Sequence, residues 1–585
     1  MDPRTAAHAL TQIAEFLELN GSDRYRSRAY RTAARAVLSL ATDDIRPLVQ
    51  SGELERLKGI GSATFGVLRE LATTGASTYL ERLSENAPEG MLEMLRVPGL
   101  GLSKIRQLHD ALGITSVQEL EEAARDGRLA TVKGFGPKTA DKIARGIAHL
   151  RATGHAVLYP HAMAEAARLL VAVRSHPSVR RAELAGSLRR RMELARDVDI
   201  VAECTVDPQT VTASFAHAPG VRNAVGAGSE HVAITFIDGA RLDLFCATTE
   251  RFAVARWRAT GSEAHVSDVV ARLEARGLSL VEDELRREGR AVPVPDEAAI
   301  YSAAGLAYVE PELREGRSEV STAATGGLPR LLEPSDIRGV LHCHSRWSDG
   351  TATVAEMAAA AEARRWSYLG VTDHSESAFY AGGLSRDQIA RQHEEIDALN
   401  EDSSGFRVLK GIEADILADG RVDYDATMLD RFDYVIGSVH SRFAMDGSAM
   451  TERVLRALDD PHLTILGHPT GRLLLTREPY AVDMQAVLEK AAESGVAVEL
   501  NADPHRLDID WRTCRTAREL GVSVEIGPDA HSTSALDNVE IGVGIARKGW
   551  LEAGDVLNTR DVEGVLAFAA ARRGGTAAVP TGRKG

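Results

Sequence analysis

The sequence predicts a chain of several domains in two fold classes, with helical and α+β domains in the first half and an α/β barrel in the second. Three observations predict this. Residues 1 to about 155 show helical periodicity with almost no runs of β-branched residues. Residues 156 to about 318 mix strand-like and helical stretches. From residue 336 onward, short apolar strands alternate with amphipathic helices, which favours parallel strands around a barrel.

Length and composition are those of a multidomain globular protein. The chain has 585 residues, of which 44% are hydrophobic and 26% charged. No apolar run approaches the ~18 residues that cross a bilayer, the N-terminus has no apolar signal core, and the cysteines form no C-x-x-C pair. We therefore expect a reducing cytoplasm, no membrane and no thiolate zinc site. The net charge of −15 argues against a nucleic-acid binder unless basic groups gather on one face.

A basic helix face is predicted in RYRSRAYRTAAR, where arginines recur at i, i+4, i+7 and i+11. Such a stripe is often a solvated surface. However, four like charges on one face repel one another unless phosphate meets them. We therefore interpret this stripe as a phosphate-binding face. Its members are Arg24, Arg28, Arg31 and Arg35.

Three segments then repeat the pattern apolar-x-Gly-apolar-Gly: LKGIGSAT (57–64), VPGLGLSK (97–104) and VKGFGPKT (132–139). Glycines permit a tight hairpin, and the helix that follows opens with free backbone N–H groups. Such a turn binds phosphate without reading bases. The segments resemble helix-hairpin-helix motifs, which implies sequence-independent DNA binding. The residues that would contact DNA are Gly59, Gly61, Gly99, Gly101, Lys104, Gly134, Gly136 and Lys138.

The middle part carries two carboxylates on one predicted strand. Asp197 and Asp199 lie on the same strand face, as two carboxylates that hold Mg²⁺ would. Asp243, in ARLDLFC, is a third candidate on another strand. Alone, an Asp-x-Asp pair is more often a solvated face. Beside a Gly-Ser turn at 186–187 and Arg190, it favours a phosphoryl-transfer site.

The run G-S-L-R-R-x-x-E-x-x-x-D-x-D (186–199), followed by R-L-D (241–243) and T-G-S (260–262), resembles the family X DNA polymerases. The resemblance covers residues 1 to about 318. It implies a nucleotidyltransferase palm, a thumb-like domain, and two Mg²⁺ or Mn²⁺ ions on Asp197, Asp199 and Asp243. The positions that would bind the nucleotide are Gly186, Ser187, Arg190, Thr260, Gly261 and Ser262.

Two places depart from this family pattern. The family usually has Tyr-Phe before Thr-Gly-Ser, where the aromatic ring excludes ribonucleotides, whereas this chain has Arg258 and Ala259. Val266 stands where many members carry an asparagine that contacts the base. Selection against ribonucleotides and polymerase efficiency therefore stay open. The helix after the first hairpin, SATFGVLREL, contains no lysine, so we expect no deoxyribose-phosphate lyase activity.

Metal-type ligands or polar groups end each predicted strand of the C-terminal part. The strands are VLHCH, YLGVTDH, VLKGIEAD, YVIGSVH, ILGHP, AVELNAD and SVEIGPDAH. In a barrel of parallel strands these ends meet on one face, where the chemistry lies. So many histidines and carboxylates are hard to explain as core packing, because unpaired buried polar groups are costly. Imidazole and carboxylate ligands without cysteine suit Mn²⁺ or Zn²⁺, with Fe as a further alternative.

The ordered set H-x-H, Asp, T-D-H, G-I-E, S-V-H, G-H-P and D-A-H resembles the PHP (polymerase and histidinol phosphatase) family. The resemblance implies a distorted (β/α)₇ barrel with a site for three ions. One departure is Gly527-Pro528, where relatives usually carry Asn-Thr. Arg442, Arg472 and Arg506 are either phosphate grips or surface salt bridges. The implied ligands are His342, His344, Glu413 and Asp529 for one ion, Asp349, His374 and His531 for a second, and Glu413, His440 and His468 for a third.

The two resemblances divide the chain into six segments. The combination predicts a monomeric, cytoplasmic DNA repair enzyme that fills short gaps from deoxynucleoside triphosphates and trims recessed 3′ ends by 3′-5′ exonuclease activity. It also admits 3′-phosphatase and abasic-site endonuclease activities. Two other hypotheses stay open: a PHP nuclease with a degenerate, DNA-binding polymerase core, and a phosphatase of small metabolites such as histidinol phosphate. The segments are a helical DNA-binding domain (1–90), a fingers-like helical domain (91–155), a palm (156–250), a thumb-like domain (251–318), a linker (319–335) and a PHP barrel (336–585).

Overall fold

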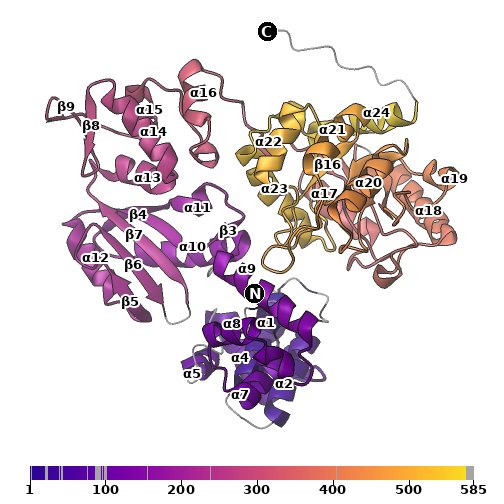
Figure 1. Ribbon diagram of the computed structural model, residues 1–585, viewed down its shortest axis with the longest axis horizontal. Helices are drawn as coiled ribbons and strands as arrows, with labels where there is room; N and C mark the ends of the chain where they lie inside the picture. Colours follow the sequence, from indigo (N-terminus) through magenta and orange to yellow (C-terminus); the bar gives the residue numbers. More distant parts are fainter. Residues whose placement is uncertain are drawn as a thin grey trace. The chain divides into compact units, whose positions relative to one another are not determined.

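The structure, a computed structural model, divides into two compact units, residues 1–155 and 156–585. Figure 1 draws the first unit in indigo to purple and the second in magenta through orange to yellow. Residues 1–574 are described apart from residues 2, 20–23, 39, 41, 43, 75–76, 86–93, 95–96, 98–99, 101, 154–155, 237–238 and 404.

The first unit is built from helices, as the sequence predicts. They are α1 (Pro3–Leu19), α2 (Arg24–Leu38), α3 (Arg46–Gln50), α4 (Ser62–Thr74), α5 (Thr78–Glu85), α7 (Leu102–Leu112), α8 (Val117–Arg125) and α9 (Pro137–Thr153). Two apolar clusters hold them together, one around Leu10 and Leu68 and the other around Leu120 and Ile143.

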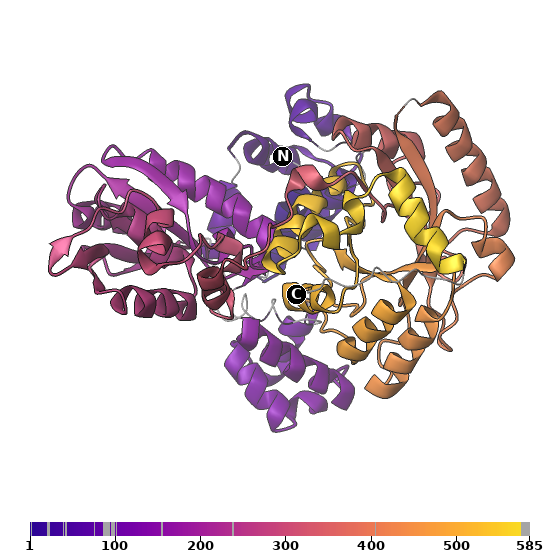
Figure 2. The same ribbon diagram turned by 90° about the horizontal axis from the view of Figure 1, so that it is seen from above.

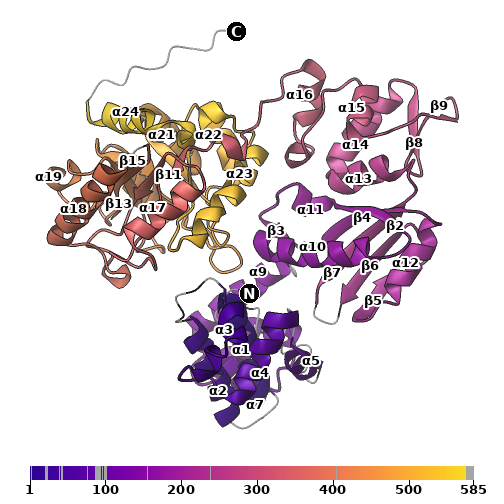
Figure 3. The same ribbon diagram turned by 180° about the vertical axis from the view of Figure 1, so that it is seen from behind.

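The second unit begins with a five-stranded sheet of strand order β2-β4-β7-β6-β5, in which β4 and β7 run parallel. Helices α10 and α12 cover one face, where Ala166 and Val211 join the apolar cluster of the sheet (Figure 3). Phe252 of α13 packs on the other face. The elements are β1 (Val157–Leu158), α10 (Tyr159–Arg174), β2 (Val179–Leu184), α11 (Gly186–Arg189), β3 (Leu194–Ala195), β4 (Val198–Cys204), α12 (Pro208–Ala216), β5 (Val221–Val225), β6 (His231–Phe236), β7 (Arg241–Ala247) and α13 (Phe252–Thr260).

A smaller layer of helices and short strands follows this sheet. Its core contains Trp257, whose buried indole N–H donates to the hydroxyl of Tyr301 at 3.2 Å. Three antiparallel strands in the order β10-β9-β8 form its edge. The elements are α14 (Glu263–Glu274), β8 (Leu278–Val281), β9 (Glu284–Arg287), β10 (Arg290–Ala291) and α15 (Glu297–Ala304).

The stretch 319–335, which the sequence predicts as a linker, is partly folded. It contains α16 (Glu319–Thr325), whose Val320 packs into the apolar cluster of the preceding layer. Glu319 is buried, accepts a hydrogen bond from the N–H of Gly316 at 2.7 Å and lies 2.7 Å from Nδ1 of His265. The sequence did not predict this helix, because Glu319 has the composition of an exposed residue and its buried partner, His265, is distant in the sequence.

The C-terminal part is a nearly closed barrel of seven parallel strands, which confirms the predicted α/β class. Strand order follows chain order from β11 to β17. A parallel bridge between Cys343 and Ala530, each three residues beyond the end of its strand, connects the segments that follow β11 and β17. In Figure 2 the helices of this part, salmon to yellow, surround the strands. The elements are β11 (Gly339–Val340), α17 (Val354–Ala363), β12 (Tyr368–Val371), α18 (Arg386–Asp402), β13 (Arg407–Asp415), α19 (Ala426–Leu429), β14 (Tyr434–Ser438), α20 (Gly447–Leu458), β15 (Leu463–Leu466), α21 (Met484–Ser494), β16 (Ala497–Asn501), α22 (Trp511–Glu519), β17 (Val524–Gly527), α23 (Asn538–Lys548) and α24 (Val562–Arg573).

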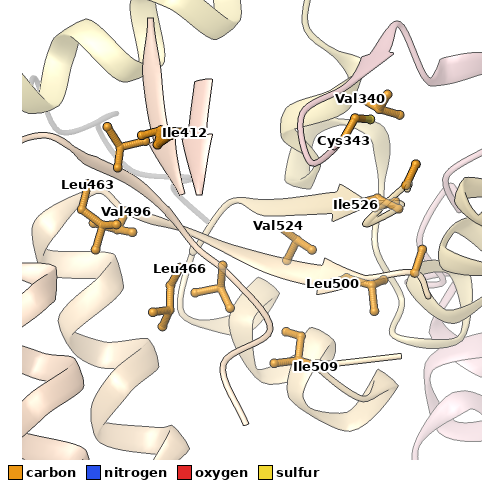
Figure 4. Packing of buried hydrophobic residues seen from close by; sticks show 14 of the residues in the cluster. Val340, Cys343, Ile412, Leu463, Leu466, Val496, Leu500, Ile509, Val524 and Ile526 are labelled. Carbon is orange, nitrogen blue, oxygen red and sulfur yellow. The ribbon is translucent and has the colours of Figure 1, made fainter. Parts of the chain in front are cut away.

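Alternate residues of the barrel strands face opposite sides. One set, which includes Ile412 and Ile526, belongs to the large apolar cluster between strands and outer helices shown in Figure 4. The other set points inward, and Leu409 and Tyr434 fill one end of the barrel together with Val565 of α24. The inward-facing residues are therefore apolar at one end of the barrel. Toward the carboxyl ends of the strands, the inward-facing positions carry polar groups.

Cys204, Cys246, Cys343 and Cys514 are buried free thiols. Among the residues that the structure describes, no helix combines the length and apolar character needed to cross a membrane.

Candidate metal centres and nucleic-acid contacts

Nine side chains converge at the carboxyl ends of the barrel strands, and we call them the barrel cluster. The alternation of the strands brings them there. Glu413 lies two positions beyond Gly411 on the inward face of β13, and Asp529 lies two positions beyond Gly527 after β17. Most are buried. The barrel cluster comprises His342, His344, Asp349, His374, Glu413, His440, His468, Asp529 and His531.

Glu413 is the centre of the barrel cluster. Its Oε1 lies 3.0 Å from Nε2 of His468 and 3.2 Å from Nε2 of His440. Its Oε2 lies 2.9 Å from Nδ1 of His374 and 3.7 Å from Nε2 of His344. A carboxylate flanked by imidazoles at both oxygens is placed to bridge two ions.

Asp349 and Asp529 anchor two further groups of candidate ligands. Oδ1 of Asp349 lies 3.3 Å from Nε2 of His531 and 3.6 Å from Nε2 of His374. Oδ1 of Asp529 lies 3.3 Å from Nε2 of His344. His344 lies within ligand distance of both groups, whereas the family resemblance assigned it to one ion.

Several nitrogens of the barrel cluster are buried without a hydrogen-bond partner. They include Nε2 of His342 and both ring nitrogens of His344. A buried polar atom left unsatisfied costs about 1–3 kcal/mol, so several of them gathered at one place require a common partner. Together with the neighbouring carboxylates, these residues fit bound divalent cations.

Two carboxylates that sequence reasoning missed orient histidines of the barrel cluster from behind. Glu499 on β16 lies 2.5 Å from Nδ1 of His342, and Asp415 lies 2.7 Å from Nδ1 of His440. A carboxylate at one ring nitrogen fixes the tautomer that leaves the other nitrogen for a metal. Period-two spacing could have found Asp415, because it lies two residues after Glu413 on β13.

Gly527, which departs from the family pattern, leaves room for Glu499. A Cβ at this glycine would lie 2.1 Å from Oε1 of Glu499. Oε2 of Glu499 accepts a hydrogen bond from the N–H of His468 at 2.5 Å. Both His468 (φ 22°) and Asp529 (φ 49°) have positive φ, a strained conformation that clusters at functional sites.

Charges within the barrel cluster shift the pKa values of its members in opposite directions. Burial opposes protonation of His374, but Glu413 and Asp349 outweigh it and raise the pKa of His374 to about 10. Burial, and then His531 and His374, lower the pKa of His344 to about 3. The imidazolium and carboxylate groups compensate one another, and cations binding here would release those protons.

The three arginines near the strand ends have different surroundings. Nε of Arg506 lies 3.3 Å from Oδ2 of Asp529, so this guanidinium borders the barrel cluster. Arg472 serves the fold instead, because its Nε donates to the carbonyl of Arg506 at 2.9 Å and its Nη2 pairs with Glu193 at 2.8 Å. Arg442 is exposed. The interpretation of Arg472 as a phosphate grip is therefore not supported.

A second group of carboxylates, the aspartate cluster, lies on the five-stranded sheet. Asp199 on β4 and Asp243 on β7 are register partners, and Asp197 precedes β4. One oxygen of each lies within 4.8 Å of the others. Burial, and then Asp197 and Asp243, raise the pKa of Asp199 to about 7. His231 on β6, which sequence reasoning missed, lies 2.7 Å from Oδ1 of Asp243.

The Gly-Ser turn beside the aspartate cluster is shaped by Asp199. Gly186 has a φ of 59°, and a Cβ there would lie 1.6 Å from Oδ2 of Asp199. Glycine is therefore required at this position. Oγ of Ser187 is buried and has no hydrogen-bond partner, which leaves this hydroxyl for a phosphate oxygen.

Arg190, a predicted triphosphate contact, is engaged within the protein. It pairs with Glu315 at 2.8 Å and donates to the carbonyl of Thr260 at 2.7 Å. Glu315 also binds Nζ of the buried Lys548 in α23. Arg190 would have to leave Glu315 in order to grip a triphosphate.

The Thr-Gly-Ser turn joins α13 to α14. The hydroxyl of Thr260 is buried and accepts a hydrogen bond from Arg189 at 2.8 Å. Ser262 is the N-cap of α14. A Cβ on Gly261 would come within 3.0 Å of two side chains of α14. The side chains of this turn therefore serve the fold.

The predicted arginine stripe lies on α2, as the periodicity indicates. Arg24 begins the helix, Arg28 and Arg35 are exposed on it, and Arg31 is half-buried. In the hairpin segments, Gly59 (φ 103°) and Gly134 (φ 90°) have positive φ. Gly61 directly precedes α4, Gly136 directly precedes α9, and Lys104 and Lys138 lie in the first turns of α7 and α9. Gly99 and Gly101 lie outside the described residues.

Family models match most parts of the chain. A helix-hairpin-helix domain matches residues 1–77 and a SAM-like helix-hairpin-helix tandem matches residues 91–148. A DNA polymerase beta thumb matches residues 255–315, and a PHP domain matches residues 341–503.

Among curated proteins, the chain is similar over almost its whole length to the DNA polymerase/3′-5′ exonuclease PolX of Bacillus subtilis (strain 168). The two are 35% identical over 578 residues, which cover 97% of this chain and 99% of the relative. A probable phosphatase of Caldanaerobacter subterraneus is 31% identical over 23% of this chain and 55% of its own length. A probable phosphatase of Syntrophotalea carbinolica is 29% identical over 34% of this chain and 81% of its own length.

Proposed function

The chain belongs to the family of DNA polymerase/3′-5′ exonuclease PolX proteins, and from that premise we propose that it is a two-site enzyme acting on DNA. The five-stranded sheet would carry a template-dependent, gap-filling polymerase, and the barrel a metal-dependent 3′-5′ exonuclease. Its substrates would be deoxynucleoside triphosphates and DNA with gaps or recessed 3′ ends. It would act as a monomer in cytoplasmic DNA repair. The observation that carries the proposal is the convergence of candidate ligands on Glu413 in a chain that also holds the aspartate cluster.

At the polymerase site, Asp197, Asp199 and Asp243 would hold two Mg²⁺ or Mn²⁺ ions. Ions bound there would supply Lewis-acid chemistry for the transfer of a nucleotide to a primer 3′-hydroxyl. The pairing of β4 with β7 fixes Asp199 beside Asp243, and His231 orients Asp243 at 2.7 Å. The buried hydroxyl of Ser187 would donate to a triphosphate oxygen.

At the exonuclease site, the nine side chains of the barrel cluster would hold up to three Mn²⁺ or Zn²⁺ ions. Bound there, such ions supply Lewis-acid activation of water and of a terminal phosphodiester. Glu499 and Asp415 would keep His342 and His440 in the tautomer that presents Nε2. Arg506 would meet the phosphate. A 3′-phosphate or an abasic-site phosphodiester would suit the same groups.

A second candidate function is a nuclease whose polymerase core binds DNA without extending it. Two contacts favour it. Arg258, which replaces the family's aromatic residue, pairs with Asp283 at 2.8 Å, and Arg190 is held by Glu315 at 2.8 Å. Absence of primer extension with either Mg²⁺ or Mn²⁺, alongside intact degradation of 3′ ends, would favour this candidate.

A third candidate function is hydrolysis of small phosphate esters, which the similarity to probable phosphatases favours. A panel of phosphomonoesters, including histidinol phosphate, is compared with a 3′-recessed DNA primer as substrate. Faster hydrolysis of a metabolite than of the primer would support it.

The proposed function is tested by paired extension and degradation assays on three proteins. We expect His344→Ala to abolish 3′-end degradation and to leave primer extension largely intact, because this side chain lies in the barrel cluster alone. Asp197→Asn should have the opposite effect. Elemental analysis of the purified proteins reports the metals. Loss of both activities from either substitution would show that the sites are not separable.

A further inference from the structure

Two aromatic side chains stand exposed beside the barrel cluster. Phe379 and Tyr380 are 86% and 61% exposed, although both carry large apolar rings. They lie in a short helical turn, η5 (Phe379–Ala381), in the segment that follows His374. Adjacent aromatic rings held in water lose the free energy that burial would give, so such a pair marks a surface that a ligand covers.

The turn that carries these rings is held in place by the barrel. The N–H of Leu384 donates to the carbonyl of His374 at 2.9 Å, which closes the segment on itself. The N–H of Ser377 donates to Oδ2 of Asp423 at 3.0 Å. A Cβ on Gly383 would lie 1.9 Å from a carbonyl oxygen, so the backbone is tightly packed there. The two rings are therefore presented from a fixed backbone.

The Tyr380 ring also lies close to candidate ligands. The centre of the Tyr380 ring is 6.5 Å from that of His374 and 6.4 Å from that of His440. The Phe379 and Tyr380 rings meet edge to face, with centres 6.0 Å apart and planes at 79°.

We propose that Phe379 and Tyr380 form a stacking platform for the unpaired base at the 3′ end of a DNA strand. This inference rests on the proposed exonuclease function. The bond to be cut joins the terminal nucleotide to the rest of the strand. When that phosphate lies at the barrel cluster, the terminal base is separated from it by one sugar. The distances from the Tyr380 ring to the rings of His374 and His440 match this separation. A flat base stacks on the face of one ring while the other ring contacts its edge.

This chemistry selects polynucleotide ends over small phosphate esters that have no aromatic ring. Every nucleobase has a π face, so stacking tolerates any sequence, as the trimming of 3′ ends requires. A base inside a duplex is already stacked, and removing it from its neighbours costs free energy. The platform therefore favours frayed or single-stranded 3′ ends, and a metabolite without an aromatic ring gains nothing from it.

The test compares two oligonucleotides that differ in the terminal base alone. One ends in a normal thymidine and the other in a tetrahydrofuran residue that has no base. We expect the wild type to prefer the thymidine end by roughly 5- to 140-fold in kcat/KM for the first cleavage, the range for stacking of one base. The double variant Phe379→Ala/Tyr380→Ala should lose that preference and match the wild type on the base-free end.

Three control variants define the effect. Phe379→Tyr and Tyr380→Phe keep both rings and should keep the preference. Val225→Ala removes an exposed apolar side chain from β5, in the five-stranded sheet, and should behave as wild type. A binding readout uses an oligonucleotide with 2-aminopurine at its 3′ end and protein carrying His344→Ala. Fluorescence should be quenched on binding, and the two alanine substitutions should remove the quenching.

The outcomes separate this inference from the function on which it rests. A wild type that leaves 3′ ends intact with every divalent metal would overturn the exonuclease proposal and the platform with it. A wild type that degrades 3′ ends, beside a double variant with an unchanged preference for thymidine, would overturn the platform alone. Equal loss by the double variant on both oligonucleotides would also overturn it, because the rings would then not act through the base.

Discussion

Replacing Glu499 by glutamine tests how strongly the buried framework of the barrel cluster controls metal binding. Oε1 of Glu499 lies 2.5 Å from Nδ1 of His342, and Oε2 accepts a hydrogen bond from the backbone N–H of His468 at 2.5 Å. A glutamine keeps the size but has one accepting oxygen, so its NH₂ group must face one of these two donors. A hydrogen bond to a charged group contributes about 1.5–3 kcal/mol. Loss of one predicts a fall in metal affinity of roughly 10- to 100-fold.

The assay is a competition between the protein and a chelator of known affinity for Mn²⁺, with 3′-end degradation measured in parallel. Glu525→Gln is the matched control. Burial, and then Glu499, raise the pKa of Glu525 to about 8, so this carboxyl is largely neutral at pH 7 and resembles an amide. Its substitution should change metal affinity little. Equal affinities of Glu499→Gln and the wild type would refute the assignment of Glu499 as the group that orients His342.

Two further predictions concern the rest of the second unit. Gly186→Ala should remove primer extension and spare 3′-end degradation, because its Cβ would lie 1.6 Å from Oδ2 of Asp199; preserved extension would mean that the turn can shift. Burial lowers the pKa of His265, and its partner Glu319 also has a lowered pKa because His265 and backbone N–H groups outweigh burial. Both groups bind protons more weakly in the folded state, so stability should fall as the pH drops below about 6.5 and further near 4. His265→Gln should lose less in Tm than the wild type between pH 7 and pH 5, because it has no imidazole whose protonation burial opposes, and an equal loss would count against this buried pair.

The fold class and the gathering of the barrel cluster could be predicted from the sequence because both follow from strand periodicity. Parallel strands that alternate with helices place their carboxyl ends on one face, so His342, Glu413 and Asp529 could be expected to meet. These predictions needed the type of each element and no detail of its packing. Asp199 and Asp243 differ, because they lie near the amino ends of β4 and β7 and were brought together by the resemblance to family X polymerases.

The partners behind the candidate ligands could not be predicted, because they depend on which strands become neighbours. Glu499 and His342 are far apart in the sequence, and a buried glutamate in a strand gives no sign of its partner. The same holds for Arg190, whose interpretation as a triphosphate contact left out its ion pair with Glu315. Arg472 likewise looked like a surface cation before Glu193 was placed beside it.

The bridge between Cys343 and Ala530 closes the barrel at the same place where candidate metal ligands gather. His342 and His344 flank one side of this bridge, and Asp529 and His531 flank the other. Shutting the ring and assembling the ligands are therefore one event. A cation bound by both His344 and Asp529 would link the two segments that close the barrel. Its binding free energy would offset the entropy lost when these segments, far apart in sequence, come together. The concentration of the metal would then control the stability of the closed barrel. An open barrel would expose β11 and β17 as edge strands that can pair with other chains.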